Sequence, residues 1–147
     1  MKYVASLRYG VIFKKAFCDV EVFTHFVKDF LGIQLEIDKV ETDKSFDTPI
    51  ENVDTRFDLY AEDKKNRVIV YIQHQNFSDD PYHRFLHSHC AAILEQVDRA
   101  KDYYPAWRVF TMVVLISGDK PDSAMTTVNF DPIDFVTQQP LGEIQHQ

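Results

Sequence analysis

Arg56-Phe57-Asp58-Leu59-Tyr60 and Tyr71-Ile72-Gln73-His74-Gln75 carry the strongest fold signal in this chain of 147 residues. Both segments are rich in strand-forming residues, and Asp63-Lys64-Lys65-Asn66 between them predicts a tight turn. A hairpin centred between Lys65 and Asn66 places Asp58 directly opposite Gln73, with Cβ atoms about 5 Å apart. A carboxylate and an amide at that distance are able to share one metal ion, although a hard cation prefers a second carboxylate.

Alternation along these strands predicts which side chains share a face. Period two puts Phe57 and Leu59 on one face of the first strand and Asp58 and Tyr60 on the other. The return strand is apolar almost throughout residues 68–75, which is typical of a strand buried on both faces.

The composition predicts one globular domain over residues 1–147, since 45% of the residues are hydrophobic and 27% are charged. No apolar run has the length of a membrane span, and the N-terminal residues lack a signal-peptide core. Cys18 and Cys90 show neither zinc-ligand nor CxxC spacing, so we expect free thiols and a cytoplasmic location.

The formal net charge of −7 argues against a general grip on nucleic acid, because phosphate contacts need Lys and Arg. Local basic groups are nevertheless present in the first two thirds of the chain, at Lys14-Lys15, Arg56, Lys64-Lys65, Arg67 and Arg84. The high aromatic content, which includes twelve Phe, also allows a homodimer surface.

The remaining segments predict an α/β fold. Apolar residues recur every three or four positions over residues 13–31, with Asp19 as an N-cap between two helices and Gly32 as the end. We expect a strand over residues 33–40 and a loop over residues 41–52. Asp80-Pro81 predicts the start of a helix. The most apolar run, residues 109–117, predicts a central strand of the sheet. Residues 126–130 and 133–136 are weaker strand candidates.

One helix between two buried strands implies a mixed central sheet flanked by helices. Gln73 and Gln75 leave amides in an apolar strand that must find partners, either in a polar pocket beside Asp58 or on loop backbone. We expect His74 on the opposite, apolar face. Arg84, in the first helical turn after this strand, is placed to reach a phosphate or to stay solvated.

Several of these segments, taken in order, resemble a known family. They are Tyr9-Gly10-Val11-Ile12-Phe13-Lys14-Lys15-Ala16-Phe17, Asp29-Phe30-Leu31-Gly32, Arg56-Phe57-Asp58, Ile72-Gln73-His74-Gln75-Asn76 and Tyr82-His83-Arg84. The set is similar to the PD-(D/E)XK nuclease family transposases, also described as recombination-promoting nucleases, over roughly residues 8–117. This resemblance implies a divalent-metal-dependent DNA endonuclease with a restriction-endonuclease-like core.

The family's strand pair usually carries Asp and then Glu-x-Gln. Asp58 matches the Asp, Gln73 stands where the Glu belongs, and Gln75 matches the Gln. The resemblance therefore implies catalytic roles for Asp58, Gln73 and Gln75, with Mg²⁺ or Mn²⁺ held at Asp58 and Gln73. It also implies that Arg84 and Lys14 bind DNA phosphate. Gly10 departs from the family pattern, which often has Asp before Phe-Lys-Lys.

Gln at position 73 keeps an oxygen ligand but removes a negative charge and any capacity as a general base. We expect low or absent hydrolysis unless Glu62, Asp54 or another acid substitutes. Three explanations of Gln73 are open: a degenerate family member, a carboxylate that has migrated elsewhere, or a deliberate Glu→Gln change. The alternative function is a non-catalytic binding or regulatory module that retains the nuclease fold.

Overall fold

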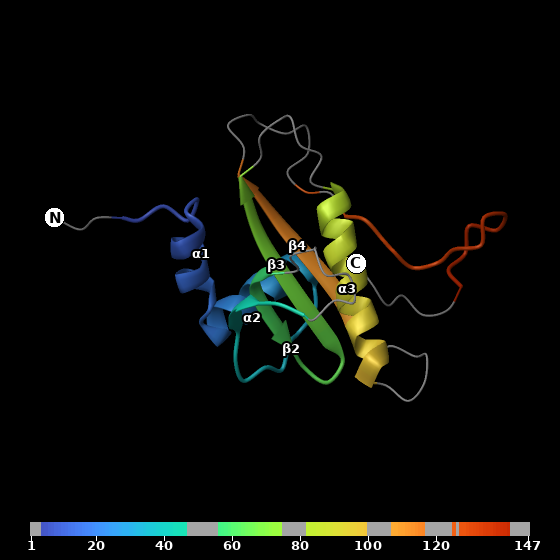
Figure 1. Cartoon of the computed structure of the whole chain (residues 1–147), viewed down its shortest axis with the longest axis horizontal. Coiled ribbons are helices and arrows are strands. Elements are labelled where there is room, and N and C mark those ends of the chain that lie inside the picture. Colours follow the sequence, from blue (N-terminus) through green and yellow to red (C-terminus); the bar gives the residue numbers. More distant parts are fainter. Residues whose placement is uncertain are drawn as a thin grey trace.

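The structure, a computed structural model, describes residues 4–46, 56–74, 82–99, 107–116, 125 and 127–141. Three helices and four strands follow one another in this part of the chain (Figure 1). Their bounds are α1 Gly10–Phe17, α2 Val20–Leu31, β1 Glu41–Lys44, β2 Phe57–Glu62, β3 Asn66–His74, α3 Tyr82–Arg99 and β4 Arg108–Ile116.

The strands form one mixed sheet in the order β1-β2-β3-β4. The first three are antiparallel neighbours, whereas β4 runs parallel to β3 after the chain has passed through α3. The predicted α/β class is therefore confirmed. β4 pairs with β3 at the edge of the described sheet, so its predicted central position is wrong.

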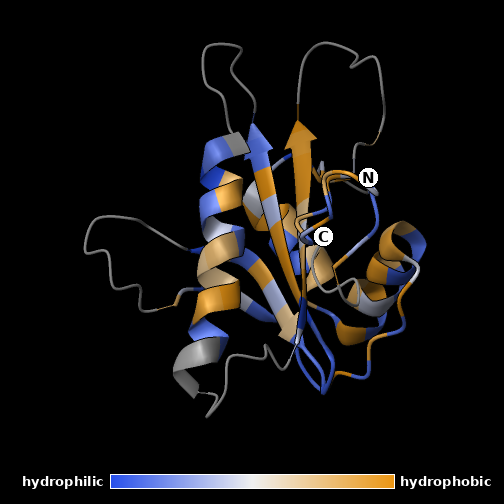
Figure 2. Cartoon of the chain, turned by 90° about the vertical axis from the view of Figure 1, so that its right-hand side faces the viewer, coloured by the Kyte–Doolittle hydropathy of each residue, from blue (hydrophilic) through white to orange (hydrophobic). Residues whose placement is uncertain are grey.

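Helices cover both faces of the sheet, with α1 and α2 on one side and α3 on the other (Figure 2). The interior strand β3 supplies both cores, which confirms the prediction of a strand buried on both faces. The core beneath α1 and α2 includes Phe13, Phe23, Val27, Leu59, Val68, Val70 and Phe110. The core beneath α3 includes Phe57, Tyr60, Ile69, Tyr71, Ala92 and Val109.

Local signals set the helix ends correctly. The Asp19 side chain caps α2 by accepting a hydrogen bond from the Val22 amide at 3.1 Å. Gly32 ends α2 in the left-handed conformation, with φ of 70°. Because both signals act within one helical turn, neither depends on the rest of the fold.

The strand predicted over residues 33–40 is absent, and β1 lies where a loop was expected. Leu35 is buried, and Ile33 and Ile37 pack against the same core without pairing in the sheet. The apolar alternation at Ile33, Leu35 and Ile37 therefore results from an extended segment that packs on the core without joining the sheet. β1 has the sequence Glu-Thr-Asp-Lys, whose polar residues suit a sheet edge but give no apolar alternation.

The weaker strand predictions near the C-terminus are also wrong for the residues described there. Residues 127–141 contain one isolated bridge, between Ile133 and Pro140, and no strand. Asp134 instead folds this segment into a turn by accepting hydrogen bonds from the Val136 and Thr137 amides.

The β2–β3 turn is centred one residue earlier than predicted, between Lys64 and Lys65. The Asp63 carboxylate accepts hydrogen bonds from the amides of Lys65 and Asn66, both at 2.7 Å. The resulting register pairs Leu59 with Val70. Asp58 therefore does not lie opposite Gln73, although a shift of two residues leaves the assignment of faces along β3 unchanged.

A buried arginine cation joins the ends of β2, β3 and α3. Arg67 is 1% exposed and donates to Glu62 at 3.0 Å, to Glu95 at 2.8 Å and to the Ala92 carbonyl at 3.0 Å. Both carboxylates neutralise a charge that would be costly to bury alone. Arg67 thereby fixes the start of β3 against α3.

Aromatic rings enclose the same cation. The Arg67 guanidinium carbon lies 4.8 Å from the Trp107 ring centre and 5.0 Å from that of Phe46. Burial, followed by the hydrogen bond to Glu62, raises the pKa of Tyr60, so its phenol stays protonated and donates to Glu62. The Trp107 indole donates to the Asp63 carbonyl, which ties the start of β4 to the β2–β3 turn.

Two expectations from composition concern the chain as a whole. Among the described residues, no helix has both the length and the apolar character needed to cross a membrane. Cys18 and Cys90 are exposed and carry free thiols, as predicted.

Replacing Arg67 by Met should lower the free energy of unfolding by about 3–5 kcal/mol, because Glu62 and Glu95 would lose their partner. Adding Glu62→Gln and Glu95→Gln to that variant should restore part of the loss, since the uncompensated charges are removed. Urea denaturation measures both effects, with the exposed Arg8→Met as the matched control. Equal stability of Arg67→Met and Arg8→Met would contradict the structural role of the network.

Partial burial opposes the charge of Asp63, but amide donors that include Lys65 and Asn66 outweigh it and lower its pKa below 3.8. A carboxyl whose pKa falls on folding stabilises the fold above its unfolded pKa, and the effect disappears as pH drops through the folded pKa. Asp63→Ala should cost about 1 kcal/mol at neutral pH. The difference from wild type should shrink below pH 3.8 in urea denaturation. Asp38→Ala, which removes an exposed carboxylate, is the matched control.

Candidate functional site

The β2–β3 ladder ends at Leu59 and Val70, and Asp58 occupies the point where β2 leaves β3. The Asp58 carboxylate accepts a hydrogen bond from the Ile72 amide at 2.8 Å. Phe57 packs beneath α3, whereas Leu59 packs beneath α1 and α2, so the predicted shared face is wrong. The Asp58 side chain thus accepts the hydrogen bond from Ile72 that a backbone carbonyl of β2 would accept in a continued ladder, at the point where β2 changes the face that its side chains present.

Gln73 and Arg84 are in direct contact. Arg84, in the first turns of α3, donates from Nη1 to the Gln73 side-chain oxygen at 3.3 Å. The Gln73 amide donates to the His74 carbonyl at 2.9 Å. Gln73 therefore has the partners that its position in an apolar strand requires, one from a helix and one from local backbone.

Lys14 lies on α1 and is paired with a carboxylate that sequence reasoning missed. Its ammonium nitrogen is 2.7 Å from Asp43 Oδ1. The register of Thr42 with Leu59 and of Lys44 with Phe57 puts Asp43 opposite Asp58 on the neighbouring strand. Asp43 also has a φ of 53°, a conformation that is uncommon outside glycine.

These contacts gather Asp58, Gln73 and Arg84 around the C-terminal half of β3, and Lys14 lies one turn along α1 from Gly10. Asp58 binds the Ile72 amide, and Gln73 is the next residue. A Cβ on Gly10 would lie 3.5 Å from an Ile72 methyl carbon, which places the start of α1 against the same part of the strand. Gln75 lies outside the described residues.

The acids considered as substitutes for the missing Glu differ in their position relative to Asp58. Glu62 lies at the far end of β2 and is held by Arg67 and Tyr60, so it is not beside Asp58. Asp54 lies outside the described residues. Asp43 is the acid that the sheet register brings next to Asp58.

The histidines of β3 and α3 differ in burial and in their contacts. His74 is exposed, contrary to the prediction of a core position, because it is the last residue of β3. His83 is exposed and His87 is half-buried. His89 is buried, with Nδ1 2.9 Å from the Thr111 hydroxyl and its ring centre 4.5 Å from that of Phe130, at a tilt of 31°.

A resident divalent metal fits these donors poorly in the conformation described. The Gln73 oxygen faces the Arg84 cation, and the Asp43 carboxylate is held by Lys14. A metal at these oxygens would have to displace both positive groups or tolerate their repulsion. No cluster of three or more His, Cys, Asp or Glu side chains suited to a metal occurs in the part of the chain that the structure describes.

Comparison with protein-family models, curated proteins and solved structures found no match. The contacts at the end of β3 are therefore the basis for any functional assignment. What they offer chemically is two carboxylates, an amide and two cations near the open end of an antiparallel pair.

Removing the Asp58 carboxylate should destabilise the fold, because the Ile72 amide would lose its acceptor. We expect Asp58→Ala to lower the free energy of unfolding by about 1–3 kcal/mol. Asp58→Asn keeps a side-chain oxygen and should lose less. Thermal and urea denaturation measure the difference, with Asp38→Ala as the control. If Asp58→Ala is as stable as that control, the hydrogen bond to Ile72 contributes nothing to the fold.

Proposed function

We propose that this chain is a DNA endonuclease domain of the PD-(D/E)XK type in which Gln73 weakens or abolishes hydrolysis. The observation that carries the proposal is the hydrogen bond from Arg84 to Gln73 beside Asp58. It joins the position of the usual second acid to a helix arginine, and the residue before Gln73 donates its backbone amide to the strand acid Asp58. Asp58, Gln73 and Arg84 are three elements of the sequence resemblance.

The sheet gives coarser support. Its mixed strand directions and its helices on both faces are compatible with the restriction-endonuclease-like core that the resemblance implies. An open end between adjacent antiparallel strands is a suitable place for a phosphodiester, because side chains from two strands and one helix reach it. Fold alone carries no activity, so the proposal depends on the side chains.

Arg84 is exposed and Lys14 is half-buried on another helix. We propose that both cations contact DNA phosphate, with Arg84 offering several donors in a planar arrangement. Lys14 would have to exchange Asp43 for phosphate. Surface ion pairs contribute only about 0–1 kcal/mol to stability, and this one is partly exposed, so the exchange of Asp43 for phosphate costs little.

Mg²⁺ or Mn²⁺, when bound, would supply a more acidic water and neutralise charge on the scissile phosphate. Gln73 is the reason to expect that this chemistry is weak, because it brings no charge and already accepts from Arg84. Asp58 retains a second carboxylate oxygen beyond the one bonded to Ile72. Asp43, on the neighbouring strand, is the proposed migrated carboxylate.

The hydrogen bond between Arg84 and Gln73 also favours a second candidate function, a non-catalytic DNA-binding module. If the Arg84 cation supplies the positive charge that a metal ion would otherwise bring, the site attracts phosphate but does not activate water. The overall charge of −7 does not exclude this role, because Arg84 and Lys14 act locally.

Gln73→Glu should create or raise nicking of supercoiled plasmid with Mn²⁺ or Mg²⁺, because it restores the missing charge. We expect at least a tenfold gain over wild type, which corresponds to about 1.4 kcal/mol in the barrier. Adding Asp58→Asn should remove the gain. Gln34→Glu makes the same charge change at an exposed loop residue and is the matched control.

Binding of a labelled DNA duplex, measured by anisotropy at low salt, separates the two candidates. An inert Gln73→Glu variant combined with duplex binding that Arg84→Ala weakens would establish the binding module in place of the enzyme. If Gln73→Glu is inert and wild type shows no duplex binding beyond that of Arg84→Ala, both functions are refuted.

A further inference from the structure

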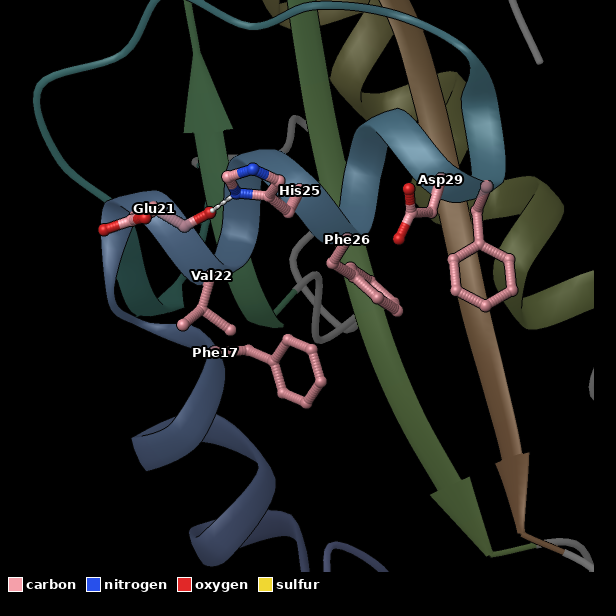
Figure 3. Close-up of a pocket in the computed structure, with 7 residues that line it drawn as sticks. Phe17, Glu21, Val22, His25, Phe26 and Asp29 are labelled. Carbon is pink, nitrogen blue, oxygen red and sulfur yellow. Dashed lines mark hydrogen bonds between the residues drawn. The ribbon is translucent and has the colours of Figure 1, made fainter.

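An apolar hollow lies where the end of α1 meets α2, and neither Lys14 nor Arg84 is among its lining residues. It has a volume of about 410 Å³ and opens to solvent. Phe17, Phe26 and Phe30 form its floor, with ring centres 4.8 Å apart between Phe17 and Phe26 and 5.1 Å between Phe26 and Phe30. Figure 3 shows Val22 beside Phe17 at one end of this row.

Part of the apolar lining of the hollow is exposed to solvent. Phe30 is 52% exposed and Val22 is 43% exposed. Phe26 and Phe17 pack inward against the core beneath α1 and α2, so they hold the hollow in shape. Val22, Phe26 and Phe30 follow one another at intervals of four residues, which gives α2 an outer apolar stripe besides its core-facing one.

The polar groups that line the hollow are hydrogen-bond acceptors. Glu21 and Asp29 stand on α2 about two turns apart and supply carboxylates at its two ends (Figure 3). The His25 Nδ1 lies 2.8 Å from the Glu21 carbonyl and must donate there, which leaves Nε2 as an acceptor in the neutral ring. Among the residues that the structure describes, no Lys or Arg lines the hollow.

Charge and shape together define what the hollow complements. An acceptor-rich, acidic rim around aromatic rings favours lysine or arginine, whose aliphatic stems lie on apolar surface while their charged ends reach carboxylates. The aromatic faces add a cation–π attraction. The same rim repels a phosphate backbone, so this surface is distinct from the proposed DNA site and does not depend on that proposal.

We propose that the hollow between α1 and α2 is a docking site for a basic amphipathic helix of another protein. Apolar side chains of the partner fill the space over Phe26 and Phe30. Its lysines or arginines pair with Glu21 and Asp29. The two carboxylates are eight residues apart on α2, about 12 Å, which matches two basic residues about two turns apart on a facing helix.

The test uses the full chain and a fluorescein-labelled helical peptide built of leucine and lysine, with binding followed by anisotropy. Phe30→Ser should weaken binding about tenfold, because the apolar side chains of the peptide would lose the exposed aromatic ring that they cover. The double variant Glu21→Gln/Asp29→Asn should weaken it several-fold, most strongly at low salt. Val22→Ser provides a second apolar variant if Phe30→Ser does not fold.

Matched control variants distinguish binding at the hollow from non-specific binding of the peptide elsewhere on the surface. Val11→Ser changes an apolar residue of α1 that is 74% exposed and does not line the hollow, and Glu36→Gln/Asp38→Asn removes two exposed acids elsewhere. Both should bind like wild type.

Three results would overturn the proposal: equal binding of a leucine–glutamate peptide, equal losses in the control variants, or a dimer in sedimentation that Phe30→Ser dissociates. The last result would make a second copy of this chain the occupant.

Discussion

A cation buried in a protein has to be neutralised and hydrogen-bonded, and this requirement at Arg67 organises one end of the sheet. Its partners come from the end of β2, from α3 and from the segment that begins β4. None of these segments supplies the whole environment, so they must assemble together. Because Glu62 pairs directly with Arg67, the same contact fixes the register of the β2–β3 pair.

The opposite end of that pair is left without such a constraint, and the candidate site lies there. β2 departs from β3 at Asp58, whose carboxylate substitutes for a strand partner. Arg84 then reaches Gln73 from the start of α3. One end of the sheet is thus closed by a buried ion network, whereas the other presents ionic groups to solvent. This division suits a domain that needs a rigid frame beside an accessible polar edge.

Sequence reasoning succeeded where a signal and its effect lie within a few residues. Asp19 and Gly32 mark helix ends whatever else the chain does. The β2–β3 pair was recognised, but period two cannot distinguish registers that differ by two residues. The Asp63 hydrogen bonds in the turn and the Glu62–Arg67 pair together select the observed register. Asp43 could not be foreseen, because β1 has no apolar alternation and its partners are distant in sequence. Gln73 and Arg84 were singled out separately, yet their contact depends on how α3 returns over the sheet.

The crossover through α3 has a consequence for how the chain folds. β4 pairs with β3 along its whole length, from Arg108 opposite Asn66 to Ile116 opposite His74. Closing the intervening segment costs conformational entropy before any of these contacts form, whereas β2 and β3 are joined by a short turn. The antiparallel strands are therefore expected to assemble first. Until β4 arrives, one edge of β3 is unpaired and its apolar residues are exposed, so crowded refolding conditions favour association between chains.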